Sequence, residues 1–238
     1  MTGTERHDEV AERLAAVRAR VAEACEQSGR DPAEITLTVV TKFFPASDVR
    51  LLAELGVTDV GENRHQEALE KVTSCAGVPV RWHYIGGLQS NKAAAVAAYA
   101  QVVESVDRAK LVAPLARGAR EADRPQPLDC LVQVSLDPPG ERASRSGVDP
   151  KDLGALTDLV AGAEGLRLAG LMAVAPLGED PDTAFARLAR IHDDVRARHP
   201  AATWLSAGMS GDLEQAIAHG ATHVRVGRAV LGPRPPIK

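Results

Sequence analysis

The sequence predicts an α/β fold, a single (β/α)8 TIM barrel with an extra N-terminal helix. Short β-rich runs alternate with helical stretches along the chain, and eight such runs can be counted. Alternation of this kind favours parallel strands, because parallel neighbours need crossover connections. A length of 238 residues suits one closed barrel. An open doubly wound sheet is the alternative architecture.

The predicted elements follow from hydrophobic periodicity. Within residues 1–30, apolar residues recur at three- and four-residue steps from Val10 to Ala24 and Ser28-Gly29 closes the run, which predicts an N-terminal helix. The predicted strands are Ile35–Thr41, Asp59–Gly61, Trp82–Ile85, Val102–Val106, Cys130–Ser135, Leu168–Val174, Thr203–Ser206 and His223–Val226. The helices predicted between them include Ala46–Leu55, Asn91–Ala100, Ala109–Ala122, Lys151–Ala163, Asp182–Arg198 and Asp212–His219. Residues 137–147 are predicted as an exposed loop and residues 233–238 as a flexible tail, and residues 1–238 as one domain.

Composition excludes several classes of function. The net charge of −4 offers no electrostatic field for nucleic acid or for an anionic membrane. Cys25, Cys75 and Cys130 lie far apart, which argues against a disulfide framework and against a cysteine metal site. The charged N-terminus is unlike a signal peptide, and no run of about 18 apolar residues could span a membrane. We therefore expect a cytoplasmic protein.

Lys42 stands out by its position. The chain has six lysines among its 28 basic residues, and only Lys42 follows directly on a predicted strand. The two-residue period puts Thr36, Thr38, Val40 and Lys42 on one strand face, which could point into the barrel. A partly desolvated lysine there would have a lowered pKa and could attack an aldehyde. On this local pattern alone, a solvated lysine at a strand end is the more ordinary interpretation.

Arg225 is the second candidate. In the run 222–228, alternation separates Val224 and Val226 from Arg225, so an outward position for the valines would send the arginine into the barrel. A buried guanidinium needs an acceptor. That acceptor is either a bound ligand or an acidic residue on a neighbouring strand, and the sequence leaves both open.

Glycine-rich segments follow the last two predicted strands. Residues 206–212 carry Ser206 and Ser210, with Ser210 placed to cap a helix that begins near Asp212, and residues 226–228 include Gly227. Loops at these positions of a barrel often bind phosphate. Ordinary turn and capping chemistry is the competing explanation. His83 is either a polar residue near the site or a satisfied core histidine, and the four-residue spacing of His219 and His223 does not predict a zinc site.

These motifs together resemble the YggS/PROSC family of pyridoxal phosphate homeostasis proteins. The resemblance runs in order from residue 35 to residue 234. It is carried by Val40-Thr41-Lys42, Gly61-Glu62-Asn63 with Gln66-Glu67, Trp82-His83-Tyr84-Ile85-Gly86 with Leu88-Gln89-Ser90-Asn91-Lys92, Ser105-Val106-Asp107-Arg108, Gly170-Leu171-Met172, Leu205-Ser206 with Gly208-Met209-Ser210, and Val224-Arg225-Val226-Gly227.

The resemblance implies a fold-type III protein that binds pyridoxal 5′-phosphate (PLP), similar to the barrel domain of alanine racemase. It assigns Lys42 as the Schiff-base lysine, Arg225 as the partner of the pyridine nitrogen and Asn63 as a neighbour of the ring. Ser206, Ser210, Gly227 and Arg228 would surround the phosphate. Arg228 departs from the family pattern, which has a small hydroxyl residue at this position.

The expected function is PLP homeostasis, as a carrier that buffers or delivers the cofactor without catalysis. Arginine at the pyridine nitrogen weakens carbanion stabilisation, and a racemase needs a second acid or base, which in alanine racemase comes from a further domain. The expected partners are PLP and PLP-accepting apoenzymes, and the expected state is a monomer or weak dimer. A slow amino-acid racemase and a phosphate-binding barrel enzyme without PLP are the alternatives.

Overall fold

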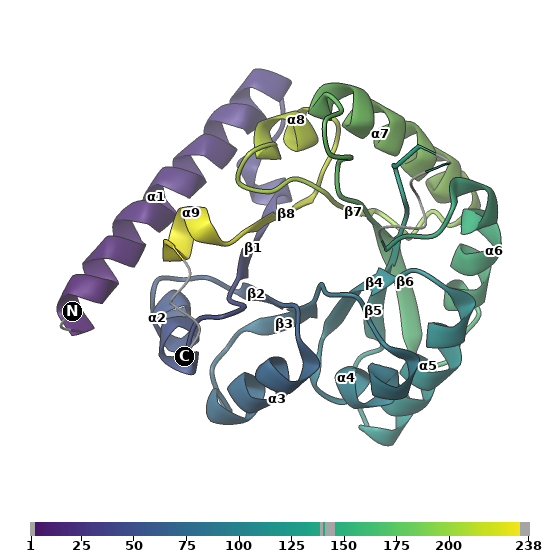
Figure 1. Ribbon diagram of the computed structural model, residues 1–238, viewed down its shortest axis with the longest axis horizontal. Coiled ribbons are helices and arrows are strands. Elements are labelled where there is room, and N and C mark those ends of the chain that lie inside the picture. Colours follow the sequence, from purple (N-terminus) through teal and green to yellow (C-terminus); the bar gives the residue numbers. More distant parts are fainter. Residues whose placement is uncertain (1–2, 139, 141–145, 234–238) are drawn as a thin grey trace.

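Eight parallel strands close into a barrel in which each strand pairs with its neighbours in chain order, from β1 round to β8 (Figure 1). The computed structural model describes residues 3–138, 140 and 146–233. The strands are β1 (Thr36–Val40), β2 (Asp59–Glu62), β3 (Arg81–Tyr84), β4 (Val102–Val106), β5 (Leu128–Gln133), β6 (Leu166–Met172), β7 (Trp204–Ser206) and β8 (His223–Val226). The closed barrel is confirmed, and the open doubly wound sheet is excluded.

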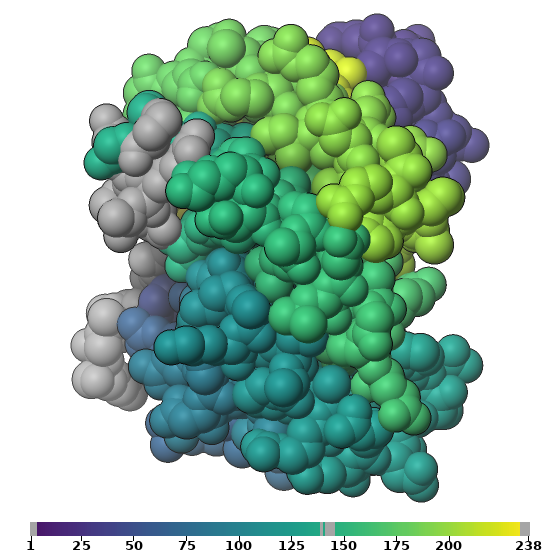
Figure 2. Space-filling view, turned by 90° about the vertical axis from the view of Figure 1, so that its right-hand side faces the viewer, coloured from purple at the N-terminus to yellow at the C-terminus, as the bar shows by residue number. Residues whose placement is uncertain are grey.

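Helices surround the barrel. The α-helices of the described residues are α1 (Gly3–Ser28), α2 (Ala46–Glu54), α3 (His65–Ser74), α4 (Ala93–Tyr99), α5 (Val112–Glu121), α6 (Pro150–Ala161), α7 (Pro181–Arg198), α8 (Leu213–Ala218) and α9 (Arg228–Leu231). Short 3-10 helices η1 (Pro32–Glu34), η2 (Ser90–Lys92) and η3 (Ala109–Leu111) precede β1, α4 and α5. Figure 2 shows from the side how helices of the middle and later chain, coloured teal to yellow-green, form a continuous outer wall.

The predicted strands are all present, with shifted ends. Both β5 and β6 begin two residues earlier than predicted, at Leu128 and Leu166, which are buried between the barrel and its helices. The N-terminal helix begins at Gly3, ahead of its apolar periodicity, and its first turns are held by polar contacts instead. Arg6 forms ion pairs with Glu9 and with Asp48 of α2. Two of these helices, α3 and α9, were given no bounds of their own in the prediction.

The N-terminal helix α1 lies on the outside of the barrel beside α8 and α9 (Figure 1). Its buried face carries Val10, Leu14, Val17 and Val21, at the spacing that predicted the helix. These side chains belong to one apolar cluster with valines of β1, β2 and β8, which therefore point outward. The outward valines are Val39, Val60, Val224 and Val226.

Alternation along the strands leaves polar side chains in the barrel interior. Thr38 and Arg225, which neighbour each other on β1 and β8, are both buried. The interior positions of β3 and β4 include His83 and Glu104, and both are buried as well. The interior is thus polar along part of its length, where barrels usually pack branched apolar residues.

Two predicted segments reach beyond the described residues. Of the loop at 137–147, residues 139 and 141–145 lie outside them, and Asp137 at its start is buried, not exposed. Of the tail at 233–238, residues 234–238 lie outside them.

Candidate functional site

Lys42 lies in a tight turn at the carboxyl end of β1. The turn closes with a hydrogen bond of 3.0 Å from Phe44 N to Thr41 O, and Phe43 has a positive φ of 72°. A left-handed conformation is uncommon for a bulky residue, and it persists only where surrounding contacts hold it. Lys42 itself is half-buried and lines a cavity together with Val40, its neighbour on the inward strand face.

A buried ionic cluster holds this turn from behind. Lys71 of α3 donates from Nζ to Thr41 O, to Glu62 Oε1 and to Glu67 Oε1, each at 2.7 Å. Glu67 also accepts the backbone N–H of Phe43. Burial raises the pKa of Glu62, and the positive charge of Lys71 opposes that rise. The cluster therefore fixes the backbone on both sides of Lys42.

No role was predicted for Lys71. Its side chain is buried, although lysine is among the residues least often buried without a partner. The spacing of Glu67 and Lys71, four residues apart, was an available signal for a helical ion pair. Nothing in the spacing indicated that Glu62 and the Lys42 turn would join the pair.

Arg225 enters the barrel from β8, as the outward position of its flanking valines predicted. Its side chain is buried, and it donates from Nη1 to Ser206 Oγ at 2.6 Å and from Nη2 to Ala173 O at 2.9 Å. Burial lowers the pKa of Arg225, and the charge of Glu104 opposes that change. Glu104 Oε2 lies 3.8 Å from Arg225 Nη1, so an acidic partner is present, on β4 across the barrel and not on a neighbouring strand.

One cavity of about 510 Å³ at the carboxyl ends of the strands brings most of the predicted site residues together. Lys42, Ser210, Arg225, Gly227 and Arg228 all line it. Apolar side chains complete its walls and rim, namely Val40, Phe44, Ile85, Val174, Leu177 and Met209. A cavity with apolar walls and a few convergent polar groups is typical of a small-molecule site.

Asn63 and Ser206 lie elsewhere. Asn63, at the end of β2, lines a neighbouring cavity of about 650 Å³ together with Tyr84 and Lys92. Ser206 is fully buried at the end of β7, where its hydroxyl donates to Glu104 Oε2 at 2.6 Å and accepts from Arg225. Neither residue is among those that line the cavity of Lys42 and Arg225.

The predicted capping role of Ser210 is wrong. Helix α8 begins at Leu213, and the residue that precedes it, Asp212, accepts the backbone N–H of Met209 at 2.6 Å. The carbonyl oxygen of Ser210 accepts a hydrogen bond of 3.0 Å from Arg20 of α1. The segment is thus tied down from outside the barrel, which leaves the Ser210 side chain at the edge of the cavity.

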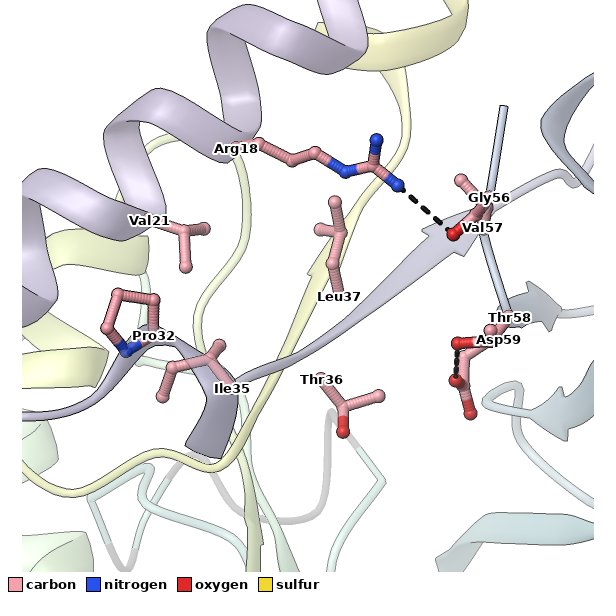
Figure 3. Close-up of a pocket in the computed structure, with 10 residues that line it drawn as sticks. All are labelled: Arg18, Val21, Pro32, Ile35, Thr36, Leu37, Gly56, Val57, Thr58 and Asp59. Atoms are coloured by element: carbon pink, nitrogen blue, oxygen red, sulfur yellow. Dashed lines mark hydrogen bonds between the residues drawn. The ribbon is translucent and has the colours of Figure 1, made fainter.

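A separate cavity of about 340 Å³ lies at the opposite end of the barrel, between α1 and the starts of β1 and β2 (Figure 3). Arg18 spans its edge and donates to the carbonyl oxygens of Leu55 and Gly56. Asp59 is also in its lining, but no predicted site residue is.

Two further observations limit the chemistry of the described part of the chain. No group of three or more histidine, cysteine, aspartate or glutamate side chains there is arranged to hold a metal ion. No helix within residues 3–138 and 146–233 is long and apolar enough to cross a bilayer.

Comparison with known proteins agrees with the fold. The family model for the N-terminal domain of alanine racemase matches residues 13–235. The pyridoxal phosphate homeostasis protein of Mycobacterium tuberculosis is 46% identical over 247 aligned residues, which cover 97% of this chain and 95% of that protein. The Escherichia coli protein of the same name is 35% identical, with coverage of 95% and 97%.

Among solved structures, PipY of Synechococcus elongatus with PLP bound superposes with a TM-score of 0.81 at 33% identity, covering 94% of this chain and all of PipY. The fold and the match to the family model define a barrel of the alanine racemase N-terminal-domain class. Within that class, the chain belongs to the family of pyridoxal phosphate homeostasis proteins.

Proposed function

We propose that the protein binds PLP between Lys42 and Arg225 and acts in the cytoplasm as a carrier that buffers the cofactor and delivers it to apoenzymes. The observation that carries the proposal is that these two side chains, 183 positions apart in the sequence, line one cavity at the carboxyl ends of β1 and β8. Membership of the family and the PLP-bound PipY structure support it.

The residues present fit the cofactor. A cavity of about 510 Å³ is within the usual range for small-molecule sites. At Gly227 an added Cβ would lie 3.2 Å from Val40 O, so a side chain there would crowd the junction of β1 and β8 beside the cavity. Ser210 and Arg228 line the same cavity as Gly227 and offer a hydroxyl and a cation to a phosphate.

Each functional group has a distinct part in binding. When bound, PLP supplies an aldehyde that links to amines and a conjugated ring that withdraws electrons. Lys42 would be the amine that holds the aldehyde carbon, and the ionic cluster behind it limits the directions its side chain can take. Arg225 carries only donors, so it would donate to the ring nitrogen and leave that nitrogen without a proton of its own. A ring whose nitrogen is unprotonated withdraws electrons weakly, which favours a role as a carrier over catalysis.

The tyrosines also favour a carrier. Racemisation needs an acid or base on each side of the bound amino acid. Neither tyrosine of the chain lines the cavity of Lys42, since Tyr84 belongs to the neighbouring cavity and Tyr99 lies against His65. Burial raises the pKa of both phenols. The relation to alanine racemase nevertheless makes slow racemisation the second candidate function.

The test is the visible absorption spectrum of three proteins titrated with PLP: wild type, Lys42→Ala and Lys92→Ala. Lys92 is an exposed lysine of the neighbouring cavity and serves as the matched control. We expect a visible band in wild type and Lys92→Ala but not in Lys42→Ala. After borohydride treatment, peptide mass spectrometry should find the cofactor on Lys42. A wild type that stays colourless with PLP would contradict the proposal.

A second measurement separates carrier from racemase. The PLP-loaded protein is mixed with a PLP-dependent apoenzyme and, separately, with L-alanine and other L-amino acids. A carrier should restore the activity of the apoenzyme and leave the amino acids unchanged. Racemisation by wild type that disappears in Lys42→Ala would favour the racemase.

A further inference from the structure

A chain of polar side chains crosses the barrel interior, starting at the cavity. Arg225 donates to Ser206 Oγ at 2.6 Å, and Ser206 donates to Glu104 Oε2 at 2.6 Å. Glu104 Oε1 lies 2.7 Å from His83 Nδ1, and Asp59 Oδ1 lies 2.8 Å from His83 Nε2. None of the five residues is more than 5% exposed. They come from β8, β7, β4, β3 and β2, so only closure of the barrel brings them together.

His83 carries a positive charge in this arrangement. Each of its ring nitrogens faces a carboxylate oxygen, and ionised carboxylates only accept hydrogen bonds, so both nitrogens are protonated. Burial alone lowers the pKa of His83, but the hydrogen bonds to Asp59 and Glu104 outweigh that effect and raise it. The third group that faces the ring is His223 of β8, at 6.3 Å between ring centroids. Burial lowers the pKa of His223 to about 4, so that ring is neutral at pH 7.

The charges along the chain alternate in sign. Arg225 is positive, Glu104 negative, His83 positive and Asp59 negative, and Arg81 Nη1 approaches Asp59 Oδ1 to 3.6 Å from the rim. Isolated buried charges are strongly destabilising, whereas a paired and hydrogen-bonded set is tolerated. The guanidinium of Arg225 is thus held from below by Ser206 and Glu104 and from the side by the carbonyl of Ala173.

We propose that Ser206, Glu104 and His83 are positioning residues for Arg225, which fix the direction of its guanidinium and set the net charge beneath the ring of bound PLP. This inference rests on the proposed PLP-binding function. It gives Ser206 a role inside the barrel in place of the phosphate contact that the family resemblance implied. It also makes the interior histidine part of the site, although it lies too deep to line the cavity.

The experiment compares Glu104→Gln and His83→Asn by the pH titration of the visible band of the PLP-loaded protein. Loss of the negative charge of Glu104 leaves more positive charge under the ring and disfavours protonation of the bound chromophore, so the midpoint should fall. Loss of the positive charge of His83 should raise it. We expect shifts of about 0.5 pH unit or more, in opposite directions. A purely structural role would not predict opposite signs.

His192→Asn is the matched control. His192 is also buried, but its Nε2 bonds to the carbonyl of Ala202 outside the barrel interior. Its replacement should leave the midpoint unchanged. Midpoints of Glu104→Gln and His83→Asn that stay at the wild-type value, or move in the same direction, would overturn the inference.

Ser206→Ala covers the case in which a charge variant does not fold. It retains every charge and removes only the hydroxyl that joins Arg225 to Glu104. We expect its dissociation constant for PLP to rise about three- to tenfold, which corresponds to the net free energy of one typical hydrogen bond. An unchanged constant would also overturn the inference. A wild type that binds no PLP would instead refute the proposed function, which keeps the two failures distinguishable.

Discussion

Replacing Lys71 by methionine removes the cation of the buried cluster behind Lys42 and puts an unbranched apolar side chain in its place. Lys71 is 6% exposed and Glu62 is 1% exposed, so Glu62 would be left as a buried carboxylate without its cationic partner. Removal of one member of a buried ion pair costs about 3–5 kcal/mol. For a chain of this size, a loss of that order should lower the melting temperature by about 6–20 °C.

The loss should depend on pH. Burial raises the pKa of Glu62 in the folded protein, and without the opposing charge of Lys71 the pKa would rise further. A carboxyl group whose pKa is raised by folding stabilises the fold at pH values below its unfolded pKa. That contribution is lost as the pH rises through the folded pKa. The difference between Lys71→Met and wild type should therefore be largest near pH 7 and smaller at pH 5.

The assay is thermal unfolding followed by circular dichroism at both pH values, with Lys110→Met as the control. Lys110 is exposed, and its replacement should change the free energy of unfolding by no more than about 0.5 kcal/mol. Equal melting temperatures for Lys71→Met and Lys110→Met at pH 7 would contradict this prediction, because they would mean that the buried pair adds nothing to stability.

Two further predictions concern stability. Burial lowers the pKa of His223 from its ordinary value of 6.5 to about 4, so the folded state binds fewer protons and should lose stability as the pH falls through that window. In urea denaturation, the free energy of unfolding should fall less between pH 7 and pH 5 for His223→Asn than for wild type. An equal fall in the two proteins would contradict this account. At Gly118, where α4 and α5 pack closely, an added Cβ would lie 2.3 Å from Ala94 O, so Gly118→Ala should cost about 1–3 kcal/mol. Gly211→Ala has open space and serves as the control, and equal melting temperatures of the two variants would count against the steric argument.

Much of the fold was predictable because it depends on near neighbours in the sequence. The period of two along β8 correctly sent Val224 outward and Arg225 inward, and the helical period of α1 correctly selected its buried face. The ends of elements were less predictable, as at Leu128 and Leu166, where pairing with neighbouring strands extends β5 and β6. The polar first turns of α1 have no apolar periodicity, and ion pairs to other residues explain why they are helical.

The site was predictable only in part, because some of its contacts join residues that are far apart in the sequence. Lys42 and Arg225 could be selected because parallel strands of a barrel bring their carboxyl ends to one face, whatever the details of packing. The direction of the Ser206 hydroxyl could not be predicted, since it depends on the carboxylate of Glu104, 102 positions away in the sequence.

Local sequence patterns were enough to predict the order of strands and helices, the inward strand faces and the lysine and arginine at the strand ends, because each of these depends on residues only a few positions apart. The folded barrel was needed to show that Lys71 supports the turn of Lys42, and that His83 and Glu104 lie beneath Arg225. Those contacts form when the barrel closes, and buried charges are tolerated there only because closure brings opposite charges into contact.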